Sequence, residues 1–233
     1  MGHLTLVRHG QASFFGADYD QLSEAGIRQS RALGEHWAAN GVRFDTVFVG
    51  PRRRHRQTLD GVAAAYRERG LPWPEATEVA ELDEHDGLTV IRHVLEGDGT
   101  IHAGVRPTDP GGTQRERAVK EFFRRYGEIM RDWARGAVVV PDVEAWPEFR
   151  ARTLRGLDAM CSVEGRGVAF TSGGAVSSMA GWLLGLDEDR VIDLSAVLRN
   201  TGLSEVHYSG RRRGLLSFNA LPHLPDPSTV TAV

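Results

Sequence analysis

An arginine, a histidine and a glycine follow one another directly after a short apolar run at residues 4–7. The run predicts a buried β-strand, and open α/β sheets place their ligands at the carboxyl ends of strands. The guanidinium of Arg8 presents a fixed fork of donors that matches phosphate oxygens. A neutral His9 imidazole can act as a nucleophile, and Gly10 lets the backbone turn sharply against a ligand. Taken alone, these residues equally fit polar side chains at an ordinary strand end.

Two further segments have features of anion sites. A basic run at residues 52–56 follows an apolar strand at residues 44–49, and a glycine-containing turn at residues 172–174 joins a buried strand at residues 167–171 to an apolar helix. Each begins a predicted helix, and a helix N-terminus favours anions through its free N–H groups and its dipole. The basic run could instead be a solvated helix face. A nucleic-acid patch is disfavoured because interleaved aromatic residues and a second basic stripe are missing.

An acidic loop at residues 81–86 follows a predicted strand at residues 76–80. A carboxylic acid near the leaving oxygen of a phosphate ester can donate a proton if burial or neighbouring charge raises its pKa. A solvated acidic loop is the alternative.

Together these segments resemble the histidine phosphatase superfamily, also called the phosphoglycerate mutase-like family. Four motifs carry the resemblance: Arg-His-Gly at residues 8–10, Leu-Ser-x-x-Gly-x-x-Gln at 22–29, a version of Ser-Pro-x-x-Arg-Ala-x-Gln-Thr at 50–58, and Leu-x-Glu at 82–84. They occur in the family's order, and the resemblance covers nearly the whole chain.

The resemblance implies roles for individual residues. His9 would be phosphorylated, Glu84 would be the proton donor, and Arg8 and Arg54 would hold the phosphoryl oxygens. No metal or other cofactor is implied, because the arginines supply the positive field. Within the acidic loop, three neighbours remain alternatives to Glu84: Glu81, Asp83 and Asp86.

The chain departs from the family at the phosphate site. The family pattern x-Ser-His-Gly-Gly aligns with residues 170–174, so its second histidine corresponds to Ser172, which with Gly173 is expected to contact phosphate. Losing one charged oxyanion donor costs on the order of 10²–10³ in rate. His55 and His85 could replace it by proximity in sequence, but each is expected to be an ordinary surface residue. The other departures are these: Gly50 for serine, His55 for alanine and Phe15 near the place of an asparagine.

The resemblance therefore predicts a metal-independent phosphomonoester hydrolase with a phosphohistidine intermediate, in which the missing second histidine would slow turnover. The alternative is a catalytically degenerate member that binds phosphate or a phosphorylated ligand. A phosphoglycerate mutase is less favoured, because re-transfer to a held intermediate would suffer most from a weakened pocket. The expected partner is a phosphorylated small molecule or phosphate, and the oligomeric state is left open.

The elements predict an α/β fold: a three-layer αβα sandwich with a mostly parallel central sheet. A helix capped by Ser23 should bury Ile27, Ser30, Gly34 and Trp37, and two final strands are expected at residues 200–208 and 214–218. A single domain is predicted at residues 1–224. A helical cap inserted at about 88–146, with a helix at 113–135, would shape the leaving-group pocket. Residues 225–233 are predicted to be a frayed tail.

Bulk properties narrow the class of protein. The chain has 233 residues, 41% of them hydrophobic and 25% charged, and a net charge of −3. This charge gives no case for nucleic-acid or membrane binding, and no stretch approaches the length of a transmembrane helix. The single Cys161 excludes an intrachain disulfide and fits a reducing compartment. A cytoplasmic location is expected.

Overall fold

The computed structural model describes residues 1–13, 20–97 and 113–232, with side chains up to residue 97 and again from residue 124. Phe15, residues 98–112 of the predicted cap and the side chains in the first half of the helix predicted at 113–135 lie outside the described side chains. No helix in the described ranges is both long and apolar enough to span a bilayer.

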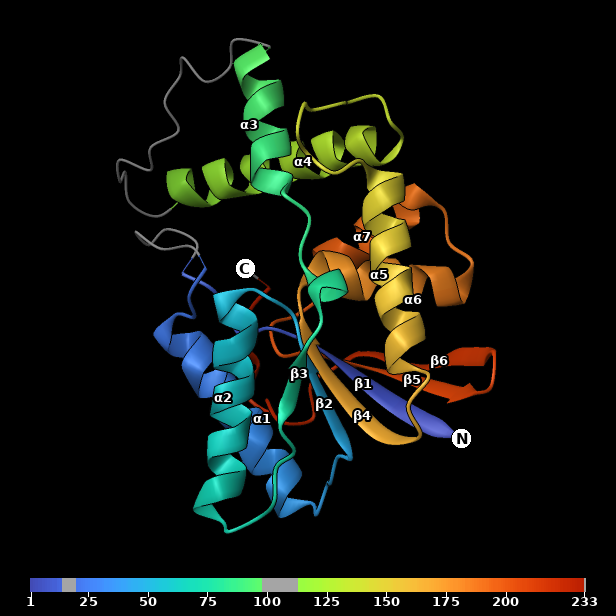
Figure 1. Cartoon of the computed structure of the whole chain (residues 1–233). Helices are drawn as coiled ribbons and strands as arrows, with labels where there is room; N and C mark the ends of the chain where they lie inside the picture. Colours follow the sequence, from blue (N-terminus) through green and yellow to red (C-terminus); the bar gives the residue numbers. More distant parts are fainter. Residues whose placement is uncertain (14–19, 98–112, 233) are drawn as a thin grey trace.

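One six-stranded sheet runs through the molecule in the order β3-β2-β4-β1-β5-β6 (Figure 1). The strands are β1 (Gly2–Arg8), β2 (Thr46–Val49), β3 (Ala76–Glu78), β4 (Gly165–Thr171), β5 (Leu203–Ser209) and β6 (Arg212–Ala220). The pairs β3-β2, β2-β4 and β4-β1 are parallel, and only β5 runs antiparallel to its neighbours β1 and β6. Arg8 pairs with Thr171, so β1 and β4 end at the same level.

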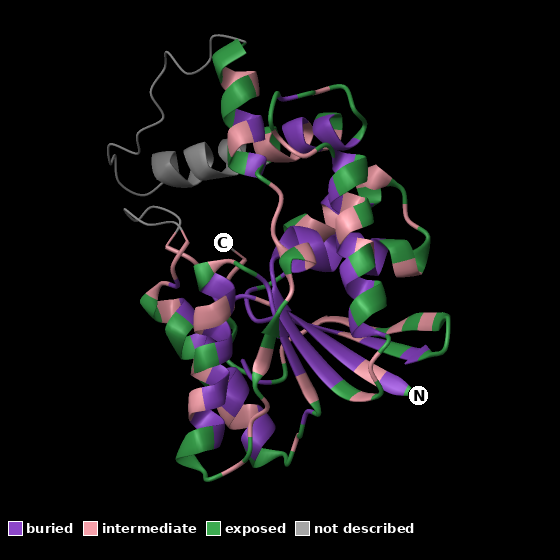
Figure 2. Cartoon of the chain, viewed as in Figure 1, coloured by how far each residue is buried: buried purple, intermediate pink, exposed green. Residues whose placement is uncertain are grey.

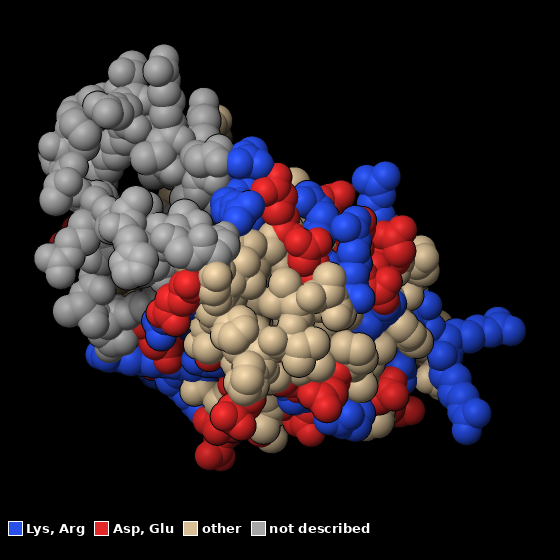
Figure 3. All heavy atoms as spheres, turned by 90° about the horizontal axis from the view of Figure 1, so that it is seen from above, with Lys and Arg blue, Asp and Glu red and all other residues tan. Residues whose placement is uncertain are grey.

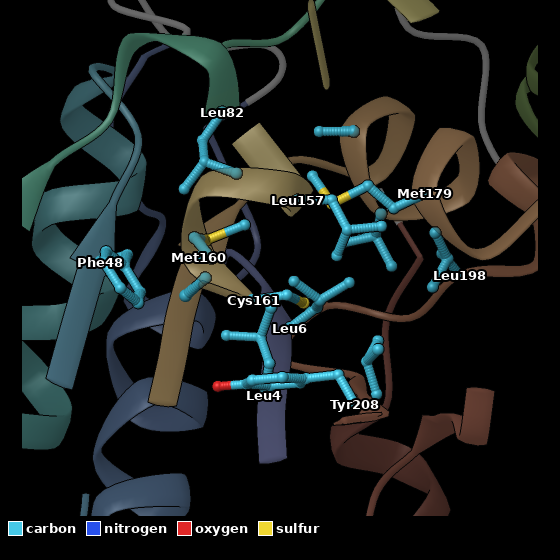
Figure 4. Close-up of a cluster of buried hydrophobic side chains, with 14 residues drawn as sticks. Leu4, Leu6, Phe48, Leu82, Leu157, Met160, Cys161, Met179, Leu198 and Tyr208 are labelled. Atoms are coloured by element: carbon cyan, nitrogen blue, oxygen red, sulfur yellow. The ribbon is translucent and has the colours of Figure 1, made fainter. Parts of the chain in front are cut away.

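Helices cover both faces of the sheet, as the predicted three-layer α/β fold requires. They are α1 (Glu24–Ala39) and α2 (Arg53–Glu68) on one face, and α5 (Trp146–Met160) and α6 (Gly173–Leu184) on the other. Leu33 and Val62 lie in the α1–α2 core, whereas Leu157 and Met179 lie in the core of the opposite face (Figure 4). The central strands are buried on both sides (Figure 2), which explains their continuous apolar runs.

Three more helices lie at the carboxyl ends of the parallel strands: α3 (Gly87–Gly97), α4 (Thr113–Ala134) and α7 (Glu188–Val197). They share a buried cluster with α5, in which Trp133, Phe149 and Ile192 take part. The division into one domain of residues 1–224 with a cap at about 88–146 stays a prediction. Viewed from this end, acidic and basic side chains are interspersed around an uncharged area (Figure 3).

Several expected details of the elements are wrong. Ile27 is 54% exposed, and Gln29 and Leu33 lie on the buried face of α1 instead. The first of the two final strands begins only at Leu203, because Thr201 adopts a left-handed backbone with φ of 57°. The second is longer than expected, at Arg212–Ala220. The predicted strand at 76–80 ends at Glu78 and passes into a 3₁₀ turn, Ala80–Leu82.

The C-terminal segment is also not frayed as far as Thr231. Another 3₁₀ turn, Pro227–Thr229, lies within it. The side-chain amide of Gln29 donates to the Thr229 carbonyl and to Thr231 Oγ1, each at 2.9 Å. The Asn200 N–H donates to the Thr231 carbonyl at 2.9 Å. These bonds attach the segment to α1 and to the turn before β5.

Candidate active site

His9 lies in the turn directly after β1, with 5% of the residue exposed. Its Nδ1 is 2.7 Å from the carbonyl oxygen of Gly10. A carbonyl can only accept a hydrogen bond, so Nδ1 carries the proton and Nε2 keeps its lone pair. Burial, followed by the charges of Arg54 and Arg8, lowers the pKa of His9 well below its ordinary value of 6.5, and the bond to Gly10 opposes this only in part. His9 is therefore neutral, with an unprotonated Nε2.

The motifs around His9 hold its turn in place. The Gly10 N–H donates to Thr58 Oγ1 at 3.0 Å, and the Gln11 N–H donates to Gln29 Oε1 at 3.0 Å. A Cβ on Gly10 would lie 2.6 Å from the Gly26 carbonyl oxygen, so the backbones of the turn and α1 meet at two glycines. Ser23 caps α1 through Gly26, as predicted. The first three motifs thus brace one loop.

Two arginines flank this turn, and both line a shared cavity. Arg54 is 3% exposed; its Nη1 donates to Asp20 at 2.7 Å and its Nη2 to Ser172 Oγ at 3.2 Å. Arg8 Nη1 donates to the Leu198 carbonyl at 2.5 Å. A Cβ on Gly173 would lie 3.4 Å from Arg8 Nε, so Arg8 packs against the first turn of α6.

His55 is not the surface residue that the sequence suggested. It is fully buried, and its Nε2 lies 2.6 Å from Ser172 Oγ. Its ring centroid is 5.8 Å from that of His9. Burial first, then Arg54 and Arg52, lowers its pKa well below 6.5, opposed by the Gly50 carbonyl. His85 is not a surface residue either: its side chain is 9% exposed and packs against Trp133 and Phe149.

Glu84 lies across the cavity against the N-terminus of α6. Its Oε2 accepts from the Gly174 N–H at 3.2 Å, and its Oε1 is 3.6 Å from His85 Nε2. A Cβ on Gly174 would be 2.2 Å from Glu84 Oε1, so this approach needs a glycine. Burial raises the pKa of Glu84, but His85, Arg54 and two backbone N–H groups together lower it below its ordinary value. The pKa of Glu84 is therefore not raised as expected of a proton donor.

The other acidic residues of the loop make structural contacts. Asp83 pairs with Arg52 at 2.5 Å. Asp86 accepts from the Thr89 N–H at the start of α3, although it also lines the cavity. Glu81 packs its Cβ against Gly156 of α5. Geometry thus favours Glu84 among the four.

The cavity that these groups share has a volume of about 460 Å³. Its polar end is formed by Arg8, His9, Arg54, Glu84 and Gly173. Leu88 and Tyr126, from α3 and α4, and Ile192 and Ala196 of α7 also line it. Of the predicted site residues, only Ser172 is absent from the lining, because it lies fully buried behind Arg54.

Sequence reasoning undervalued one residue, His55, and one clue to it was available. The chain departs from the family at positions 50, 55 and 172, and these positions meet in space. A Cβ on Gly50 would lie 2.5 Å from His55 Nδ1, while Ser172 contacts His55 Nε2. Three substitutions far apart in the chain are therefore one local rearrangement.

Comparisons with known proteins identify the family. The family model of the histidine phosphatase superfamily (branch 1) matches residues 4–92 and 91–221. A 2,3-bisphosphoglycerate-dependent phosphoglycerate mutase from Bradyrhizobium diazoefficiens is 32% identical over 89 residues, which are 36% of this chain and 43% of that protein. The chain spans about half the length of the curated relatives it matches.

Solved structures show the same fold. A phosphoserine phosphatase mutant from Entamoeba histolytica, in complex with phosphoserine, superposes with a TM-score of 0.61 at 17% identity, over 96% of this chain and 100% of that one. The α-ribazole phosphatase of Shigella flexneri gives a TM-score of 0.59 at 17% identity, over 94% and 96% of the two chains. With the family model matching nearly the full length, the chain belongs to the histidine phosphatase superfamily.

Proposed function

We propose that the protein is a metal-independent phosphomonoester hydrolase that acts through a phosphohistidine at His9. The observation that carries the proposal is the hydrogen bond from Nδ1 to the Gly10 carbonyl. It directs the Nε2 lone pair away from the backbone, in a cavity that Arg8 and Arg54 also line. A neutral nucleophile beside two guanidinium groups suits attack on a phosphoryl group.

In the first step, Nε2 of His9 bonds to phosphorus while the bond from phosphorus to the ester oxygen breaks. The departing oxygen takes a proton from the Glu84 carboxyl group. In the second step, water attacks phosphorus and gives a proton to the Glu84 carboxylate. The N–P bond then breaks, which releases phosphate and restores neutral His9.

Glu84 must carry a proton for the first step, although its surroundings in the protein lower its pKa. A phosphate ester in the cavity offsets the charge of Arg54 and adds negative charge near the carboxylate. Both effects raise the pKa of Glu84. Substrate binding thus prepares the acid.

The cavity supports a phosphatase over a mutase. A mutase must hold a second anionic group of its intermediate while the phosphoryl group is re-transferred. Among the described lining residues, Arg52 already pairs with Asp83, and the wall from α3, α4 and α7 includes Leu88, Tyr126 and Ile192. This wall suits the uncharged part of a phosphorylated small molecule. A cytoplasmic location remains part of the proposal.

The test is hydrolysis of an aryl phosphate by the full chain in the presence of a metal chelator. We expect turnover that is abolished in His9→Ala and kept in His93→Ala, which removes an exposed histidine of α3. The trapped intermediate should be an acid-labile, base-stable phosphoryl adduct on the wild-type protein alone. Activity that survives in His9→Ala would refute the mechanism.

The second candidate is a binding protein without turnover. It is favoured by Ser172, which cannot supply the charge of the histidine it replaces. Inorganic phosphate titrated calorimetrically into the wild type and Arg54→Ala distinguishes the two. Phosphate binding that depends on Arg54, with no hydrolysis of any ester tested, would support the binding protein.

A further inference from the structure

His55 has no role in the steps above, although it lies beside residues that do. It lies in the first turn of α2 and is fully buried. Burying an imidazole without a use for its polar atoms is costly. Its Nε2 contacts a serine hydroxyl at 2.6 Å, and the same hydroxyl accepts from Arg54, which lines the cavity.

Space for the ring is provided by the neighbouring backbone. Gly50 follows β2, and its N–H donates to the Phe170 carbonyl at 2.9 Å, which ties it to β4. A side chain there would begin 2.5 Å from His55 Nδ1. Because Gly50 is held by the sheet, it cannot withdraw, and the imidazole fits only against a glycine. The ring is therefore confined with Nε2 directed at Ser172.

Hydrogen-bond counting then restricts what Ser172 can do. A guanidinium can only donate, so Ser172 Oγ accepts from Arg54 and retains one O–H to donate. Ser172 is the N-cap residue of α6 but makes no side-chain cap bond. Because Ser172 is fully buried and does not line the cavity, the acceptor for its O–H is His55 Nε2, 2.6 Å away.

We infer that His55 is a positioning residue for phosphoryl transfer: its Nε2 accepts the Ser172 O–H, which orients Ser172 Oγ as the acceptor that holds Arg54 Nη2 beside the cavity. The pair, from α2 and α6, thus fixes the orientation of a guanidinium that lines the cavity. This inference rests on the proposed function, because Arg54 is assigned there to the phosphoryl group.

The test compares His55→Leu, His55→Gln, Ser172→Ala and the double variant His55→Leu/Ser172→Ala. Ser172→Ala should lower kcat about 10²-fold, and His55→Leu about tenfold, at or below the range for one oxyanion donor. Because His55 acts through Ser172, the double variant should stay within about twofold of Ser172→Ala, where independent effects would multiply. His55→Gln, which can accept the Ser172 O–H through Oε1, should recover part of kcat.

A control separates this role from packing. Thr153→Val removes another fully buried side-chain hydrogen bond, which joins Thr153 Oγ1 of α5 and Ser178 Oγ of α6 at 2.8 Å. It should lower the melting temperature and leave kcat unchanged. If His55→Leu behaves like Thr153→Val, or if the effects of His55→Leu and Ser172→Ala multiply, the inference is overturned.

Orthovanadate binding, followed by calorimetry, distinguishes failure of the inference from failure of the proposed function. Vanadate adopts the five-coordinate geometry of phosphoryl transfer and needs no turnover. His55→Leu and Ser172→Ala should each weaken vanadate more than inorganic phosphate. If the wild type does not hydrolyse esters but shows this pattern, the proposed phosphatase function is refuted and the role of His55 and Ser172 is retained. If the wild type is active and His55→Leu binds vanadate with unchanged affinity, only the positioning role of His55 is refuted.

Discussion

Restoring the family histidine by Ser172→His alone should damage the protein. A ring on residue 172 begins where Oγ now lies, 2.6 Å from His55 Nε2. Comfortable contacts between such atoms are about 3.5–4.0 Å, so the overlap is about 1 Å, and both residues are fully buried. Overpacking of this kind costs about 1–3 kcal/mol. A loss of about 2 kcal/mol lowers the melting temperature by roughly 4–8 °C in a chain of this size.

The matched variant is Ser172→His/His55→Ala, which removes the obstructing ring. It should recover most of the lost stability and exceed Ser172→His in kcat/KM for an aryl phosphate. Thermal unfolding and steady-state kinetics of the two variants and the wild type provide the measurement. Ser172→His with an unchanged melting temperature and raised kcat/KM would refute the reasoning, because it would mean that His55 does not occupy the space a second histidine needs.

Three other outcomes are expected. Glu84→Gln keeps an acceptor for the Gly174 N–H but has no proton to transfer, so kcat should fall by about 10²–10³ while calorimetric vanadate binding persists. Gly174→Ala should lower kcat because its Cβ would displace Glu84, whereas Gly214→Ala, which meets open space, should not; equal kinetics of the two would contradict this account. Burial lowers the pKa of His223 to about 4, so the unfolded chain binds the proton more readily. This one group should therefore lower stability as the pH decreases between about 6.5 and 4, by up to about 1.4 kcal/mol per pH unit, and denaturant titrations of His223→Gln should show a shallower decline.

The phosphate end of the cavity illustrates how far local sequence can reach. An apolar run that ends in Arg8, His9 and Gly10 predicts a strand followed by a ligand-binding turn, and the order of the motifs indicated the fold. These predictions succeed because strand ends, caps and glycine turns are local features. The burial of Ile27 was predicted wrongly, because the helical period does not determine which face of α1 meets α2 and the sheet.

The sequence by itself determined the family, the order of the layers and the segments that meet at the carboxyl ends of the strands. Only the tertiary structure decided the proton position on His9, which depends on one carbonyl 2.7 Å away. It also distinguished Glu84 from the other acidic residues of its loop, because the N–H of Gly174, ninety residues later in the chain, donates to its carboxylate. Above all, it brought His55 to Ser172 across 117 residues. When positions are compared one at a time, Ser172 looks like the loss of the family histidine. Burial and hydrogen bonding, however, act between residues that are neighbours only in space.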